Sequence, residues 1–105
     1  MTLEQLSAIL RQTGYPVAFE SFPKKEAPAM PYICYLAPQV NNFYADGVVY
    51  YTATRIAVML YTNLRDLTAE GKVEAVLTAN GITWTKDADY NEREKCYEII
   101  YEIEV

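Results

Sequence analysis

The 105-residue sequence contains no histidine. This absence excludes Ser/His/Asp and Cys/His catalytic arrangements, and also the zinc sites that need an imidazole ligand. The four glycines, Gly14, Gly47, Gly71 and Gly81, are isolated from one another, so the sequence has no glycine-rich phosphate-binding loop. Most common enzyme templates are therefore excluded, and we expect no enzyme, no catalytic residues, no cofactor and no metal site.

Cysteine is also scarce. Cys34 and Cys96 form no C-x-x-C motif, and both lie in apolar segments. We expect both to be small buried hydrophobic residues; a disulfide between them is the less favoured alternative.

Long apolar runs are missing as well. No segment approaches the roughly 20 apolar residues that cross a bilayer, and the N-terminus lacks a signal-peptide pattern. With 51% hydrophobic residues and only five prolines, the composition is typical of an ordinary globular protein. The sequence therefore predicts a single domain over residues 1–105 that resides in the cytoplasm and does not contact a membrane.

Basic residues are few, and the charge is unevenly distributed. The formal net charge is −5, yet residues 1–86 carry as many bases as acids. The excess therefore lies in residues 87–105. Because nucleic-acid binding depends on clustered lysine and arginine, and Lys24-Lys25 is the only basic pair, we expect no specific DNA binding.

Two helices are predicted. Thr2 and Gln5 have the spacing of a capping box before an apolar stripe, which predicts a helix from about Leu3 to Thr13 that stops at Gly14. Asp66 can cap a second helix that ends at Asn80-Gly81. Its expected core positions are Leu67, Val73, Val76 and Leu77.

Strands are predicted at 17–22, 32–36, 54–62, 82–85 and 96–105. The last strand alternates: Tyr97, Ile99, Tyr101, Ile103 and Val105 form an apolar face, and the opposite face is largely acidic. The element order predicts an α+β fold: a mainly antiparallel sheet of about four to five strands, with two helices packed on one face.

Asp46-Gly47 is a strong hairpin signal, because a two-residue turn needs positive φ at residues that tolerate it. We expect a long projecting β-hairpin around this turn. Apolar residues on such a projection usually contact a partner. The candidate interface residues are Phe43, Tyr44, Tyr50 and Tyr51.

Acidic residues near the C-terminus form two groups, and each group allows two interpretations. Glu98, Glu102 and Glu104 share one face of a strand, which favours a solvated or partner-facing acidic face over paired catalytic carboxylates. Asp87, Asp89 and Asn91 have calcium-loop spacing to Glu98, but the required glycine is replaced by Glu92. An acidic turn between two strands is therefore the favoured interpretation of residues 87–92.

Five segments together resemble small structural proteins of long-tailed phages and prophages, in particular the tail-terminator or tail-completion group. The resemblance covers nearly the whole chain, but its motifs are structural and carry no catalytic signature. The segments are Thr2 to Leu10 with Gly14 to Phe19, Ala29 to Leu36, Asn41 to Gly47, Val58 to Thr62, and Tyr97 to Val105.

The resemblance implies a homo-oligomeric ring, by analogy a hexamer, on the head-proximal end of the tail tube. Such a ring ends tube polymerisation and docks to the head, so its partners are the tail-tube protein and a head-completion protein. It implies assembly in the host cytoplasm and residence in the virion tail, with DNA passing through an acidic channel without specific binding. A head–tail joining or head-completion protein and a non-phage protein-binding module are the alternatives.

Overall fold

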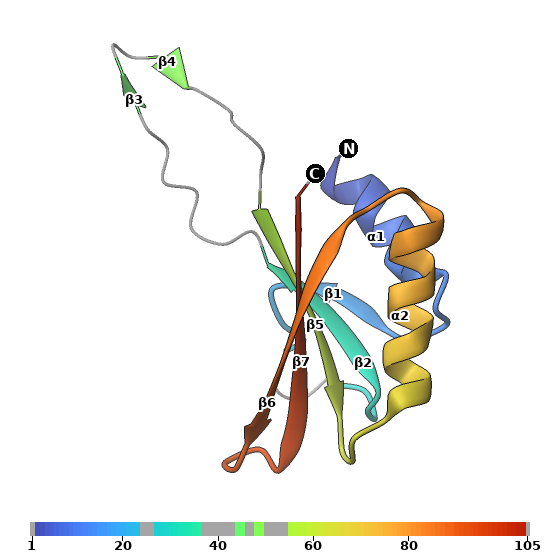
Figure 1. Ribbon diagram of the computed structural model, residues 1–105. Helices are drawn as coiled ribbons and strands as arrows, with labels where there is room; N and C mark the ends of the chain where they lie inside the picture. The colour runs from blue at the N-terminus through green and yellow to red at the C-terminus, as the bar shows by residue number, and fades with distance from the viewer. Residues whose placement is uncertain (1, 24–26, 37–43, 46–47, 50–54, 105) are drawn as a thin grey trace.

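The computed structural model describes residues 2–23, 27–36, 44–45, 48–49 and 55–104. Two helices lie on one side of a five-stranded sheet, as Figure 1 shows. Among the described residues, none of the helices is long and apolar enough to cross a membrane.

The sheet has the strand order β1-β2-β5-β7-β6. β1 (Val17–Phe19) runs parallel to β2 (Tyr32–Leu36). β5 (Arg55–Thr62), β7 (Cys96–Glu104) and β6 (Trp84–Asn91) continue the sheet in antiparallel pairs. The predicted α+β class is thus confirmed, and the sheet is mixed because of the short parallel β1.

Both helices begin at the predicted caps. In α1 (Leu3–Arg11), the Thr2 hydroxyl accepts a hydrogen bond from the Gln5 backbone N–H at 3.1 Å, and the Gln5 side chain accepts one from the Thr2 N–H at 2.8 Å. In α2 (Leu67–Ala79), the Asp66 carboxylate accepts a hydrogen bond from the Ala69 N–H at 3.0 Å. These bonds satisfy backbone donors that the helices themselves leave free.

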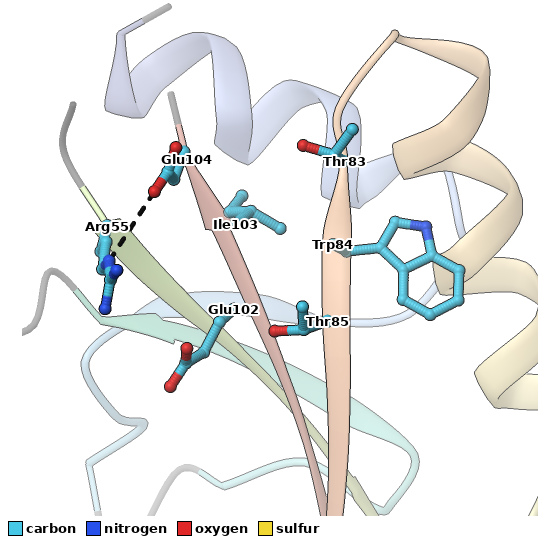
Figure 2. A pocket seen from close by; sticks show the side chains of 7 residues that line it. All are labelled: Arg55, Thr83, Trp84, Thr85, Glu102, Ile103 and Glu104. Carbon is cyan, nitrogen blue, oxygen red and sulfur yellow. Dashed lines mark ion pairs between the residues drawn. The ribbon is translucent and has the colours of Figure 1, made fainter.

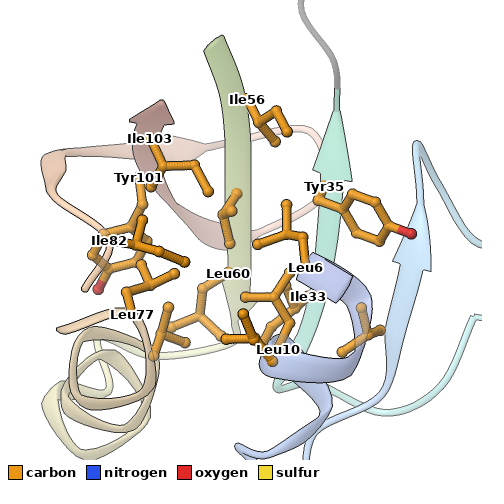
Figure 3. Packing of buried hydrophobic residues seen from close by; sticks show 14 of the residues in the cluster. Leu6, Leu10, Ile33, Tyr35, Ile56, Leu60, Leu77, Ile82, Tyr101 and Ile103 are labelled. Carbon is orange, nitrogen blue, oxygen red and sulfur yellow. The ribbon is translucent and has the colours of Figure 1, made fainter. Parts of the chain in front are cut away.

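The core lies between the helices and one face of the sheet. Leu6 and Leu10 of α1 and Leu77 of α2 are fully buried, and they pack against the central strands (Figure 3). The predicted alternation of the last strand is confirmed at the residues that the structure describes. The sheet side of the core is formed by Ile33, Tyr35, Ile56, Val58, Leu60, Ile99, Tyr101 and Ile103.

The prediction for residues 82–91 is wrong in two respects. The strand begins at Trp84 instead of Ile82 and continues to Asn91, so the expected acidic turn is part of β6. The reason is long-range pairing, because β6 pairs residue by residue with β7 from Trp84 opposite Ile103 to Asn91 opposite Cys96.

The chain instead turns at 92–95. There the Asn91 side-chain oxygen accepts hydrogen bonds from the backbone N–H groups of Arg93 and Glu94, both at 3.1 Å. An asparagine that binds the backbone ahead of it is a common turn device.

Two expectations for the helices also need correction. Helix α1 ends at Arg11, not Thr13, because residues 12–14 form a turn in which Gly14 has a φ of 85°. In α2, Leu67 is 69% exposed, and Ala69 and Glu70 occupy the buried positions one turn before Val73. A charged residue therefore lies in the apolar stripe of this helix.

The Asp46-Gly47 signal coincides with a short ladder. β3 (Tyr44–Ala45) pairs antiparallel with β4 (Val48–Val49), with Tyr44 opposite Val49 and two residues between the strands. Most of the surrounding segment lies outside the described residues, so the long projecting hairpin stays a prediction.

Replacing Leu6 by alanine should lower the free energy of unfolding by about 2 to 5 kcal/mol, because its side chain is fully buried between α1 and the sheet. Leu64, which is 79% exposed, provides the matched control, and Leu64→Ala should change stability by less than about 0.5 kcal/mol. Urea denaturation followed by circular dichroism measures both. Equal effects of the two substitutions would contradict the helix-on-sheet core.

Candidate functional site on the uncovered face of the sheet

The candidate site is the face of the sheet that points away from α1 and α2, which we call the open face. Side chains alternate between the two faces of a strand, so every second residue of β2, β5, β7 and β6 belongs to it. The strand register aligns these residues in rows across the sheet. The rows are Leu36–Ala57–Glu102–Thr85, Cys34–Met59–Ile100–Asp87 and Tyr32–Tyr61–Glu98–Asp89, with Arg55 opposite Glu104 at one end.

Each row is apolar or aromatic on β2 and β5, and each becomes polar towards β6. Leu36, Met59 and Ile100 are half-buried although neither α1 nor α2 covers them. An apolar sheet face normally lies against another layer of the protein. The open face therefore combines an apolar half with an acidic half, and both halves lie on the side of the sheet away from α1 and α2.

Aromatic side chains pack along one end of the apolar half. The rings of Tyr32 and Tyr61 stack with centroids 5.0 Å apart, and Phe22 meets Tyr32 edge to face at 5.3 Å. The Tyr61 hydroxyl contacts the Met59 sulfur at 3.5 Å. Burial raises the pKa of Tyr61 well above its usual value, and the nearby Cys34 and Glu98 add to this shift. The phenol is therefore neutral and acts as a packing surface.

Cys34 and Cys96 both lie on this face, and both are free and buried. Burial raises the pKa of the Cys34 thiol, and a hydrogen bond from the Phe22 backbone only partly opposes the shift. Burial also raises the pKa of the Cys96 thiol, reinforced by the negative charges of Glu98 and Glu94. Both thiols stay protonated at neutral pH, whereas a nucleophilic cysteine needs the thiolate.

The acidic half lies on β7 and β6. Asp89 stands directly opposite Glu98, an arrangement of like charges that costs stability in a sheet. Glu98 accepts a hydrogen bond from the Asn91 side chain at 3.1 Å, and Arg55 lies 3.7 Å from Glu104. Among the described residues, Arg55 is the only base within 4 Å of a carboxylate on this face.

The three predicted acidic residues differ in exposure. Glu102 and Glu104 are exposed, and Glu98 is half-buried. Successive residues on one face of a strand lie roughly 6.5 to 7 Å apart, so these carboxylates form a stripe and not a closed pair. Asp87 and Asp89 lie on the extended strand β6, and the described residues contain no cluster suited to hold a metal ion.

A pocket of about 210 Å³ lies at the end of the acidic half, and Figure 2 shows the residues that line it, with Glu102 and Glu104 of the open face beside Ile103. Figure 2 shows Arg55 and Glu102 on one side of the strands, while Trp84 points to the side of α2. The Trp84 indole N–H donates to the Thr78 hydroxyl at 3.2 Å. A larger hollow of about 590 Å³ is lined by Met30, Pro31 and residues 62–68.

The opposite side of the sheet holds a buried charge that the sequence analysis missed. Glu70 of α2 is 1% exposed and accepts two hydrogen bonds from Arg65, at 2.8 and 3.2 Å. Lys86 of β6 lies 2.6 Å from Glu70 and 2.8 Å from Glu74. The sequence does contain a signal for the buried position of Glu70. Glu70 lies three residues before the core residue Val73, and residues three apart share one face of a helix.

This cluster joins the edge strand β6 to α2. Burial alone would raise the pKa of Glu70, but the hydrogen bonds and charges of Arg65 and Lys86 outweigh it and lower that pKa. The Tyr101 hydroxyl donates a hydrogen bond to Glu74 at 2.7 Å, and burial together with this bond raises the pKa of Tyr101. Glu70 is therefore held as an ionised, paired group, which is a structural arrangement and not that of a proton-transferring carboxyl.

The predicted interface residues at the hairpin are not placed by the structure. Phe43, Tyr50 and Tyr51 lie outside the described residues, and for Tyr44 only its backbone pairing in β3 is described.

Comparison with family models, with curated proteins and with solved structures finds no match to this chain. The open face is therefore interpreted from its own geometry and charge.

Replacing Glu70 by glutamine should lower the free energy of unfolding at pH 7 by about 1.5 to 3 kcal/mol, because it removes charged hydrogen bonds from a buried site. The pKa of Glu70 is lower in the folded protein, so its contribution is complete above the unfolded value near 4.3 and is lost as the pH falls below it. Urea titrations at pH 7 and pH 3 should therefore show the difference shrinking in acid.

Glu92→Gln in the exposed 92–95 turn is the control for this experiment, and it should be near neutral at both pH values. A Glu70→Gln effect that is the same at pH 3 and pH 7 would contradict an ionised Glu70.

Proposed function

We propose that this chain is a structural subunit of a phage or prophage tail, a tail terminator that forms a homo-oligomeric ring at the head-proximal end of the tail tube. The ring ends tube polymerisation and offers a docking surface to the head. The role comes from the resemblance of the sequence to this group, and the open face supplies the structural support.

The observation that carries the proposal is the half-buried apolar surface on the open face. Leu36, Met59 and Ile100 form a surface on the central strands that neither helix covers. Contiguous apolar surface beside polar residues is typical of a protein contact. A subunit that works by contact needs such a surface and needs no reactive group.

The chemistry of the described side chains agrees with this role. The thiols of Cys34 and Cys96 have raised pKa values, and Glu70, the fully buried carboxylate among the described residues, is paired with two cations. The apolar half of the open face suits a neighbouring protein better than a water-filled channel. The acidic half repels DNA, so a molecule passing close to it would not be retained.

In this proposal the two candidate surfaces have different partners. The hairpin residues Phe43, Tyr44, Tyr50 and Tyr51 contact neighbouring copies in the ring. The open face contacts another protein of the tail or head, such as the tail-tube protein or a head-completion protein. The chain would assemble in the host cytoplasm and remain in the virion tail.

Light scattering and native mass spectrometry of the purified chain should show a ring, about six times the 12.0 kDa subunit mass. Deleting residues 40–49 should leave a cooperatively melting domain and reduce the mass to that of the subunit, because the deletion spares the helix-on-sheet core. Loss of the cooperative melt in the deletion variant would show that the hairpin belongs to the core.

Electron microscopy of lysates that lack this protein separates the terminator from its alternatives. Tail tubes of uncontrolled length are expected, because nothing would stop polymerisation. Tails of normal length that fail to join heads would favour a head–tail joining or head-completion role. A protein that stays monomeric or dimeric, with normal virions in its absence, would favour a non-phage binding module.

A further inference from the structure

The two faces of the sheet differ in how they are covered. On one face, α1 and α2 bury Ile33, Val58 and Ile99 completely. On the open face, the neighbouring positions Met59 and Ile100 are only half-buried. A sheet with apolar residues on both faces is normally covered on both by another layer, which can be a helix or a second sheet. The apolar positions Leu36, Met59 and Ile100 lie on three adjacent strands, roughly 10 Å across, which is about the width of one helix, so we expect the cover to be a helix.

The charges of the open face restrict which helix can fit. The strand positions of this face carry five carboxylates and one guanidinium, that of Arg55. The opposed pair Asp89 and Glu98 costs stability until a positive charge approaches it. A covering helix thus needs lysine or arginine along one side and apolar residues along the other. The five carboxylates belong to Asp87, Asp89, Glu98, Glu102 and Glu104.

A second copy of this chain fits these requirements poorly. Two open faces placed together would bring their carboxylates against each other. The helices offer no basic stripe either, because α1 exposes Glu4 together with Arg11, and Lys72 is the only exposed base within α2. Charge complementarity therefore favours a different protein.

From these observations we infer that the open face binds a basic amphipathic helix of another protein. Its apolar side covers Leu36, Met59 and Ile100, and its lysines or arginines lie over the carboxylates of β7 and β6. The eight residues of β5 span about 26 Å, which a helix of roughly 14 residues nearly matches at about 21 Å. The inference rests on the proposed function only in treating the open face as a contact surface.

The probe is a synthetic 14-residue peptide of leucine and lysine, with leucine at the i, i+3, i+4 and i+7 spacing of an amphipathic helix. Its affinity for the purified chain is measured by isothermal titration calorimetry at two salt concentrations. Binding should weaken at high salt, and a peptide with glutamate in place of lysine should not bind. Amide shifts in NMR spectra should change in β5, β7 and β6 and not in α1.

Substitutions on the open face test whether the peptide binds there. The double variant Glu98→Gln/Glu102→Gln should weaken binding about five- to tenfold. Glu4→Gln/Glu92→Gln removes the same charge from other surfaces and should leave the affinity unchanged. Met59→Gln should weaken binding as well, whereas Leu64→Gln on the loop before α2 should not.

Four outcomes would overturn the inference. The first is the absence of binding, and the second is binding that responds equally to the open-face variants and to their controls. The third is a change of oligomer mass in the open-face variants, which would identify a second copy as the occupant. Peptide binding that appears only after deletion of residues 40–49 would also overturn it, by assigning the face to this chain's own segment. Peptide binding to a protein that forms no ring would instead reject the proposed function alone.

Discussion

The two helices cover only one face of the sheet, although the middle strand β5 carries mainly apolar and aromatic side chains on both of its faces. β5 and β7 lie in the interior of the sheet, with strands on either side of each. Their alternating side chains build the core on one face, where Val58, Leu60 and Ile99 are fully buried. On the other face the same alternation leaves Met59 and Ile100 half-buried. Burial of apolar area is complete at the core positions and only partial at Met59 and Ile100, so the open face keeps apolar surface that a second protein would cover in our proposal.

Charge follows the same division. On the helix side, the charged groups are paired: Glu70 lies between Arg65 and Lys86, and this cluster ties the edge strand β6 to α2. On the open face, the carboxylates outnumber the bases, and Asp89 faces Glu98 across the strands. The paired charges on one side connect α2 to β6, whereas in our proposal the unbalanced charges on the other side select the kind of partner. Much of the net charge of −5 therefore lies on the open face.

Local patterns were enough to predict the α+β class, both helix caps and the inward face of the last strand. Local patterns failed where long-range contacts determine the structure. β6 extends through Asp87 and Asp89 because β7 offers paired backbone groups, although both residues are poor strand formers. Glu70 occupies a core position because Lys86, sixteen residues later, folds next to it. The stripe of Glu98, Glu102 and Glu104 was predictable because side chains alternate between the two faces of a strand. Its apolar neighbours on β5 were not, because they depend on the order of the strands in the sheet, which local sequence patterns do not reveal.

Neighbouring residues on β7 are expected to serve different purposes: one contributes to the fold, and the next, in our proposal, contacts a partner. Ile99→Ala and Ile100→Ala test it most directly, since residue type, strand and substitution are the same. Measured by urea unfolding, Ile99→Ala should cost about 2 to 5 kcal/mol, because Ile99 is fully buried, and Ile100→Ala only about 1 kcal/mol. Equal losses of stability would contradict the account, because Ile100 would then belong to the core of the isolated domain.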